Sequence, residues 1–291
     1  MDFLIQKISI NHDFFPDSLR TIKNPPQELY YCGKINKQEN CLAIVGARIC
    51  SKYGQECCLE IGSQIVDAGL TIVSGLAKGI DSFAHLAALR KNSRTIAVLG
   101  TAIDNIYPKE NLPLAKEILK NNGLIISEYA PGQATAPYSF AERNRLIAGL
   151  ALGTLVIEAK ENSGSLLTAK ATKEQGKKIF AIPGNIHSET SKGCHALIKD
   201  GAKLVQNKND ILQELKINSL PLFLKNDKPI TEISSNEEKI LKTLEKEPLQ
   251  IEDLIKITGL APSKIMSLLS VLEIKNKIID LGDNTYCLNR N

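Results

Sequence analysis

The tripeptide Ser163-Gly164-Ser165 stands between a short apolar run and a stretch with the composition of a helix. A serine at a helix start accepts hydrogen bonds from backbone amides, and a glycine there lets the backbone come close to a ligand. Because the first amides of a helix have no partner inside it, such a start binds anions such as phosphate. An ordinary capped turn has the same residues, so the motif by itself leaves both interpretations open.

Two further loops carry residues of the same kind. Gly46 and Arg48 follow an apolar run, where an arginine can hold a phosphate through two hydrogen bonds or else pair with a neighbouring carboxylate. The second loop combines a hydroxyl, two glycines and a cation, namely Ser74, Gly75, Lys78 and Gly79. Its spacing matches neither the GxGxxG loop nor the Walker loop, so it indicates phosphate contact without a nucleotide fingerprint.

An aromatic residue and two arginines share one expected helix: Phe140 is followed by Arg143, Asn144 and Arg145. Aromatic rings stack on nucleic-acid bases and arginines bind phosphates, so the group favours a nucleic-acid contact. The alternative is that the ring packs in the core and the arginines form structural ion pairs.

Residues that perform catalysis in other proteins do not form a recognisable set here. His85 and Asp81 lie on one expected helix and are interpreted as structural. Glu158 ends an apolar run, and we expect it to pair with Arg143 or Arg145. The seven cysteines and four histidines lack the spacing of metal ligands. The sequence therefore predicts neither a catalytic residue nor a metal or cofactor.

Short apolar runs alternate with helical patterns through most of the chain, which is typical of a parallel, doubly wound (Rossmann-like) α/β sheet. Ligands bind such sheets at the carboxyl ends of the strands. The motif-bearing loops all leave the expected strands at that edge. The expected strands are 42–45, 71–73, 95–99, 124–127, 155–157, 178–182 and 203–205, and the helices are 51–68, 80–90, 109–120, 140–151 and 194–199.

The remaining segments give the predicted domain organisation. Residues 1–41 read as a short N-terminal extension, 42–215 as the Rossmann-like domain and 216–235 as a linker. Residues 236–291 show three helical runs (237–247, 251–258 and 262–273) and a hairpin (277–281 with 285–288), the pattern of a winged helix. The run 262–273 has one lysine, which favours a protein contact over DNA reading.

Composition narrows the class of protein only a little. The formal net charge is +4 over 291 residues, a mild excess that permits a polyanionic partner. No apolar run nears the roughly 18 residues of a membrane-spanning helix. The odd number of cysteines without a CxxC pair is typical of reduced thiols. We therefore expect a soluble, cytoplasmic protein.

Seven motifs together resemble the family of DNA-processing proteins called DprA or Smf: IVGAR (44–48), IVSGLAKGIDSFAH (72–85), TIAVLG with YPKEN (95–111), SEYAPG (127–132), FAERNRLIAGLA (140–151), SGSLLTAKAT (163–172) and FAIPG (180–184). The resemblance implies a homodimer without enzymatic activity that binds single-stranded DNA in a basic groove and brings RecA onto incoming strands during natural transformation. Carried over to this chain, the groove would be lined by Gly46, Arg48, Ser74, Gly75, Lys78, Gly79, Phe140, Arg143, Asn144, Arg145, Ser163, Gly164, Ser165, Thr168 and Lys170.

Two departures from the family pattern stand out. Asn162 occupies a position that is often basic, so the phosphate contact there would be lost or moved to Lys160 or Lys170. The 41 residues before the expected sheet also leave little room for the helical N-terminal domain of many members. A nucleotide-processing enzyme related to phosphoribohydrolases, whose PGGxGTxxE loop is absent here, and a nucleotide sensor acting through the winged helix remain the alternatives.

Overall fold

The computed structural model describes residues 4–217, 235–245, 247–260, 265, 268, 269, 272, 277–280 and 285–289. The chain forms two compact units, Met1–Phe223 and Leu224–Asn291. Among the described helices, none is long and apolar enough to cross a membrane.

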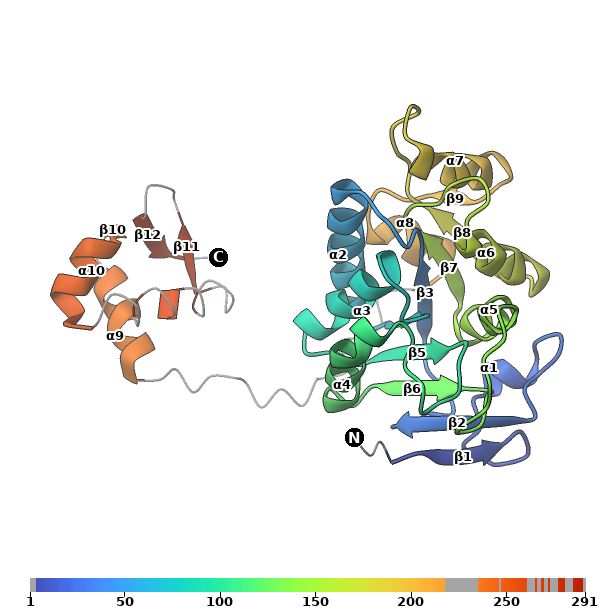
Figure 1. Ribbon diagram of the computed structural model, residues 1–291. Helices are drawn as coiled ribbons and strands as arrows, with labels where there is room; N and C mark the ends of the chain where they lie inside the picture. Colours follow the sequence, from blue (N-terminus) through green and yellow to red (C-terminus); the bar gives the residue numbers. More distant parts are fainter. Residues whose placement is uncertain are drawn as a thin grey trace. The chain divides into compact units, whose positions relative to one another are not determined.

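The first unit is built on one nine-stranded sheet in the order β1-β2-β6-β5-β4-β3-β7-β8-β9 (Figure 1). Strands β3 to β9 are parallel, β2 pairs antiparallel with β6, and β1 pairs antiparallel with β2. The strand bounds are β1 (Gln6–Ser9), β2 (Glu28–Gly33), β3 (Cys41–Val45), β4 (Thr71–Ser74), β5 (Thr95–Leu99), β6 (Leu124–Ser127), β7 (Gly153–Val156), β8 (Lys178–Ala181) and β9 (Lys203–Leu204).

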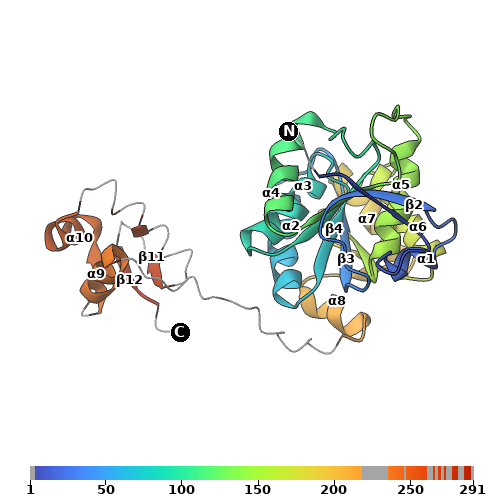
Figure 2. The ribbon, with the colours of Figure 1, turned by 90° about the horizontal axis from the view of Figure 1, so that it is seen from below.

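Helices cover both faces of this sheet (Figure 2). One face carries α2 (Lys52–Asp67), α3 (Ile80–Arg90), α4 (Leu112–Lys120) and α8 (Lys208–Glu214). The other carries α1 (Asp17–Arg20), α5 (Ser139–Leu150), α6 (Gly164–Glu174) and α7 (Lys192–Lys199).

Strand β3 shows why the central strands read as unbroken apolar runs. Cys41, Ala43 and Val45 enter the core under α5, whereas Leu42 and Ile44 enter the core under α2 and α3. Because successive side chains point to opposite faces, a strand covered on both sides must be apolar at every position. The predicted doubly wound fold is confirmed.

The order of strands reverses beside β3. The chain adds β4, β5 and β6 on one side of β3 and then crosses over, so that β7 pairs with the other side. The loops after β3 and β7 therefore leave neighbouring strands in opposite directions, which opens a crevice at the carboxyl edge. The Gly46–Arg48 loop and the Ser163–Ser165 loop meet at this point.

The N-terminal segment differs from the expectation. Residues 1–41 contribute β1 and β2 to the same sheet and α1 to one of its faces. The strands escaped sequence prediction because they have few buried positions: Ile8 is the buried residue of β1, and Leu29 and Cys32 are those of β2. Antiparallel strands at an edge need less apolar surface than central ones.

Two helix starts also differ from the expected bounds. The run 109–120 begins as a 3-10 turn (Lys109–Asn111) before α4, which has Pro113 in its first turn. Helix α7 starts at Lys192, two residues before the expected Cys194, after a second 3-10 turn (Glu189–Ser191).

The second unit contains α9 (Ser235–Leu244), α10 (Ile251–Thr258) and a three-stranded sheet in the order β10-β12-β11. Its strands are β10 (Leu249–Gln250), β11 (Ile278–Asp280) and β12 (Thr285–Leu288), and Gly259 ends α10 with a φ of 67°. The expected helix 262–273 lies mostly outside the described residues, although Ile265, Leu269 and Leu272 are buried in this unit's core. Most of the expected linker also lies outside them.

Candidate nucleic-acid interface

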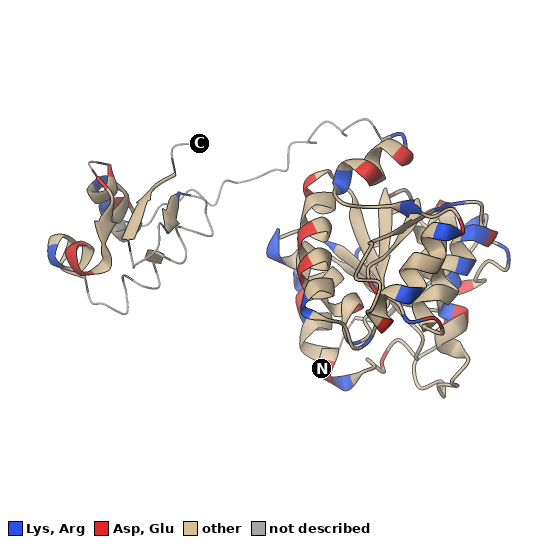
Figure 3. Ribbon diagram, turned by 90° about the horizontal axis from the view of Figure 1, so that it is seen from above, with Lys and Arg blue, Asp and Glu red and all other residues tan. Residues whose placement is uncertain are grey.

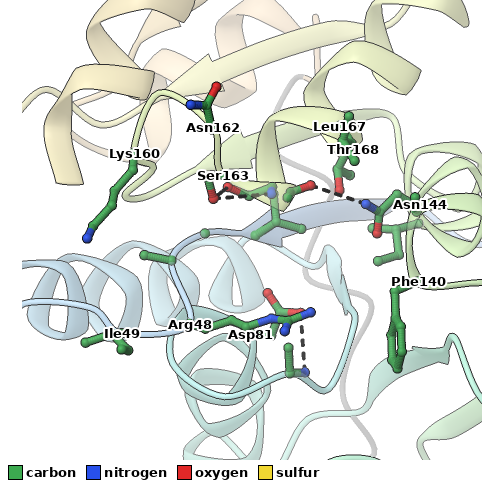
Figure 4. A pocket seen from close by; sticks show the side chains of 18 of the residues that line it. Arg48, Ile49, Asp81, Phe140, Asn144, Lys160, Asn162, Ser163, Leu167 and Thr168 are labelled. Atoms are coloured by element: carbon green, nitrogen blue, oxygen red, sulfur yellow. Dashed lines mark hydrogen bonds between the residues drawn. The ribbon is translucent and has the colours of Figure 1, made fainter. Parts of the chain in front are cut away.

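A cavity of about 780 Å³ lies at the reversal of strand order. We call it the switch-point groove. One wall is the loop after β3, the other is the loop after β7 with the start of α6, and α5 closes one end (Figure 4). Its lining consists of residues 45–49 and 160–165 together with Ala77, Asp81, Pro137, Phe140, Ala141, Arg143, Asn144, Ile147, Leu167, Thr168 and Glu189.

The β3 wall presents Arg48 to solvent. Its side chain is exposed, and among the described residues no carboxylate forms an ion pair with it. Packing requires a glycine at position 46, because a Cβ there would lie 2.7 Å from Cγ1 of Ile80 on α3. The glycine thus lets α3 approach the loop, and the arginine two residues later is left available for an anion.

The β7 wall is the start of α6, and it fits the predicted anion site. The Ser163 hydroxyl accepts from the Ser165 amide at 3.4 Å, and the two hydroxyls are 2.8 Å apart. A Cβ on Gly164 would meet no atom within 4 Å, so the protein's own packing does not require a glycine there. The open space over Gly164 faces the groove, where a ligand has room to approach the helix start.

Arg143 has a different role from the one its sequence position indicated. It is 6% exposed, and its guanidinium donates to the carbonyl of Gly75 at 2.7 Å and to that of Val98. Burial lowers its pKa to about 10. Arg143 therefore joins α5 to the carboxyl ends of β4 and β5, and it shapes the floor of the groove from below.

Asp81 lies beside Arg143 on that floor. Its carboxylate accepts from the amide of Gly75 at 3.1 Å and from that of Ala77 at 3.4 Å. Burial raises its pKa, against the lowering effect of Arg143 and the two amides. Both groups hold the loop after β4 in place, which agrees with the structural interpretation of Asp81.

Phe140 is half-buried at the end of the groove. Its ring packs against Gly100, where a Cβ would lie 2.8 Å from Cδ1 of the ring, and its centroid is 5.5 Å from that of Tyr107. The ring lines both the groove and a small adjoining cavity. This location fits a surface on which a base stacks.

The structure brings nine of the fifteen expected residues into the groove lining: Gly46, Arg48, Phe140, Arg143, Asn144, Ser163, Gly164, Ser165 and Thr168. The other six lie outside it. The Ser74 hydroxyl is buried and donates to the Ile44 carbonyl at 2.7 Å. Lys78 pairs with Glu110 at 2.8 Å, Arg145 with Glu128 at 2.6 Å and Lys170 with Glu174 at 4.0 Å. Gly75 and Lys78 line the small cavity that adjoins the groove.

The expected pairing of Glu158 with an arginine is wrong. Its carboxylate accepts from the Ser51 amide at 2.8 Å, the Ser51 hydroxyl at 2.7 Å and the Thr190 hydroxyl at 2.8 Å. A strand-end carboxylate binds the nearest unpaired donors, and here those belong to the start of α2. Both expected arginines have other partners.

His85 confirms its structural interpretation. It is fully buried, its Nδ1 lies 2.9 Å from the Thr95 hydroxyl, and burial lowers its pKa to about 3. The Thr95 hydroxyl already donates to the Ile72 carbonyl at 2.7 Å, so it accepts from Nδ1–H of a neutral imidazole.

Two apolar residues of the groove were missed by sequence reasoning. Ile49 is 87% exposed and Leu167 is 48% exposed, and both line the groove. Both could have been found from their places beside predicted site residues, because Ile49 directly follows Arg48 and Leu167 lies one turn after Ser163. Of the two lysines named in place of a basic residue at Asn162, the groove contains Lys160.

Charge in the groove is concentrated at its mouth. Arg48 and Lys160 are exposed on opposite walls, and Glu161, next to Lys160, is an exposed carboxylate of the same lining. Asp81 is buried beside Arg143, and Glu189 pairs with Lys192 at 2.6 Å. Over the helices of the first unit, basic and acidic residues are interspersed (Figure 3). The local cations, rather than the overall charge, therefore give the groove its attraction for a polyanion.

Comparison with known proteins agrees with this geometry. The sequence profile described as "DNA recombination-mediator protein A" matches residues 6–216, and that of the "DprA winged helix domain" matches 225–284. The chain belongs to the DNA recombination-mediator protein A family. The second match identifies the C-terminal unit as a winged helix, as expected.

Curated members of the family are similar over most of the chain. DNA processing protein DprA of Streptococcus pneumoniae is 46% identical over 209 residues, covering 72% of this chain and 73% of its own. Protein Smf of Synechocystis is 36% identical over 296 residues, covering 89% and 74%.

Solved members of the family share the fold. The crystal structure of DprA from Streptococcus pneumoniae has a TM-score of 0.68 at 44% identity, covering 72% of this chain and 74% of that one. A structure of DNA processing protein A from Helicobacter pylori, described for its single-stranded DNA binding mode, has a TM-score of 0.67 at 28% identity and covers 75% and 98%.

Proposed function

We propose that this protein binds single-stranded DNA in the switch-point groove and passes the strand to RecA. The observation that carries the proposal is the position of Arg48, an exposed cation without an ion pair among the described residues, opposite the open start of α6. A guanidinium that faces the positive end of a helix dipole across a groove binds the phosphates of a chain. The Helicobacter pylori relative, whose structure is described for single-stranded DNA binding, supports the same ligand.

The groove suits a single strand better than a duplex or a mononucleotide. Phe140 offers a ring for stacking, and Ile49 and Leu167 add exposed apolar surface. Unpaired bases expose faces that such side chains cover, whereas the bases of a duplex are already stacked. We infer that phosphates lie along Arg48, Lys160 and the α6 start, with bases turned toward the apolar side chains.

A binding titration tests this proposal. Fluorescence anisotropy with labelled single-stranded and double-stranded oligonucleotides across salt is expected to show tighter, salt-sensitive binding to the single strand, since phosphate contacts release counterions. Lys120→Ala is a matched control, because Lys120 is exposed at the end of α4, which precedes β6 and so lies at the opposite edge of the sheet. Equal affinity of Arg48→Ala and Lys120→Ala for the single strand would refute the assignment to the groove.

We further infer that the protein acts by binding, without catalysis of its own, as a homodimer in natural transformation. The family resemblance and the description of the matched profile as a recombination mediator support this role. RecA-driven strand exchange on DNA covered by a single-strand-binding protein is expected to speed up when the protein is added, and sedimentation is expected to give twice the mass of the chain. Release of free base from nucleoside monophosphates would instead support a nucleotide-processing enzyme.

A further inference from the structure

A second cavity, of about 460 Å³, lies at the carboxyl edge of the sheet next to the groove. The start of α2, the end of β7 and the loop after β8 form its walls, and we call it the Tyr53 cavity. Its lining consists of Ser51, Tyr53, Glu158, Pro183, Gly184, Asn185, Ser188 and Ser191. None of the residues assigned to the DNA site above lies in it.

The Tyr53 cavity is a neighbour of the switch-point groove along three chain segments. Segments 49–51, 158–160 and 188–189 each line the groove with one end and the Tyr53 cavity with the other. Residues two apart in a chain are at most about 7 Å apart, and stacked bases follow each other at roughly 3.4 Å. A strand that leaves the groove beside Lys160 therefore reaches the Tyr53 cavity within about two nucleotides.

The Tyr53 ring is held in a fixed position with much of its surface in solvent. Its hydroxyl donates to the Pro183 carbonyl at 2.7 Å, and a Cβ on Gly184 would lie 4.0 Å from its Cε1 atom. The side chain is nevertheless 47% exposed, and Ile186, which follows Asn185 of the lining in the chain, is 74% exposed. Burial of the hydroxyl raises the pKa of Tyr53 to about 12, so the anchoring hydrogen bond persists at neutral pH.

Because the ring is already fixed, little conformational entropy is lost when a base stacks on it. Neighbouring apolar surface also favours this stacking. Every base has a face that stacks on an aromatic ring, irrespective of sequence. Cations stand nearby: Lys52, next to Tyr53, is 89% exposed and 3.8 Å from Glu56, and Lys192, next to Ser191 of the lining, pairs with Glu189 at 2.6 Å. The surroundings thus offer both a stacking surface and exchangeable partners for phosphate.

We propose that the Tyr53 cavity is a second nucleotide site, in which a base of the single strand leaving the switch-point groove stacks on Tyr53. This inference rests on the proposed function and extends it. The strand would run from Phe140 past the α6 start and Lys160 to Tyr53, so that two aromatic rings mark the ends of one path. The side-chain amide of Asn185 in the lining, whose oxygen accepts from the His187 amide, would donate to an edge of the stacked base or to its sugar.

The test compares wild type, Tyr53→Leu and Tyr53→Phe on oligothymidylates of about 6 and about 15 nucleotides, within the range of known single-strand sites. Tyr53→Leu keeps an apolar side chain without the ring, and Tyr53→Phe keeps the ring without the hydroxyl that anchors it. We expect Tyr53→Leu to bind the longer strand about tenfold more weakly, within the range for one lost stacking contact, and Tyr53→Phe to bind close to wild type. Strands with 5-iododeoxyuridine are expected to photocrosslink to the peptide containing Tyr53.

Crosslinks confined to groove residues, or a Tyr53→Leu affinity within about twofold of wild type on both strands, would overturn the second site. Thermal melting of each variant checks that it is folded. Failure of the wild type to bind either strand would instead refute the proposed function itself. Weaker binding of Arg48→Ala together with unchanged binding of Tyr53→Leu would refute the second site alone.

Discussion

The carboxylate of Glu158 at the end of β7 holds both donors of Ser51 at the start of α2. Its Oε2 accepts from the Ser51 amide at 2.8 Å, and its Oε1 accepts from the Ser51 hydroxyl at 2.7 Å. Ser51 is the N-cap of α2 and stands three residues after Arg48. One buried carboxylate therefore fixes the walls of the switch-point groove relative to each other.

Glu158→Gln is expected to lower both the stability of the fold and the affinity for single-stranded DNA. An amide has one acceptor oxygen where the carboxylate has two, so buried donors lose a charged partner at a cost of about 1–3 kcal/mol in the free energy of unfolding. Urea denaturation and anisotropy titrations measure the two effects. Glu117→Gln is the control, since Glu117 is an exposed carboxylate on α4 outside the groove lining, so its loss should leave both stability and affinity unchanged.

The two arginines of the groove are expected to separate binding from stability. Arg48→Ala removes an exposed phosphate contact, so it should lower the salt slope of single-strand binding by roughly 0.7 while unfolding changes by less than about 0.5 kcal/mol. Arg143→Ala leaves the Gly75 and Val98 carbonyls without their partner, at about 1–3 kcal/mol for each buried group. Arg143→Ala with wild-type stability would contradict the structural role assigned to Arg143.

Two glycine substitutions are also expected to separate the effect on DNA binding from the effect on stability. Gly164→Ala meets no atom within 4 Å, so the protein should fold normally and bind single strands more weakly because the methyl group occupies the approach to the α6 start. Gly46→Ala places a Cβ 2.7 Å from Ile80 Cγ1, and overpacking of this kind costs about 1–3 kcal/mol. Parallel melting and binding curves check both. Wild-type affinity in Gly164→Ala would show that no ligand approaches this glycine.

His85 is expected to make the fold less stable in mild acid. Its pKa of about 3 lies below the ordinary 6.5, so the unfolded chain binds a proton that the folded chain does not. The stabilisation by the neutral histidine is therefore fully present above pH 6.5. Below that pH, its contribution to the free energy of unfolding falls by about 1.4 kcal/mol per pH unit. The raised pKa of Asp81 acts in the opposite direction, because there the folded state is the one that retains the proton.

The variant His85→Asn isolates the histidine from Asp81. It removes the titrating group and keeps a polar side chain near the Thr95 hydroxyl. The slope of unfolding free energy against pH between about 5 and 6.5 should therefore decrease by the equivalent of close to one bound proton. The free energy of unfolding itself is expected to be lower than that of wild type. An unchanged slope would mean that His85 takes up a proton in the folded state.

Much of the first unit was predictable from the sequence because its signal is local. Strand β5 and helix α3 have the predicted bounds, since each is an apolar or amphipathic run between clear breakers. Strands β1 and β2 were not predicted, because a segment with one or two buried positions gives no periodic signal. The place of β2 was decided by its pairing with β6, about 95 residues later in the chain, and the place of β1 by its pairing with β2.

The sequence by itself determined the fold class and the loops that carry chemistry, because strand ends, glycines and helix starts are written in neighbouring residues. Only the tertiary structure decided which charges are available. Arg48 and Arg143 are the same residue type in motifs of equal promise, yet one is exposed and the other is bound to two carbonyls. Solvation and partners depend on which distant segments pack against a side chain, and no local pattern encodes that.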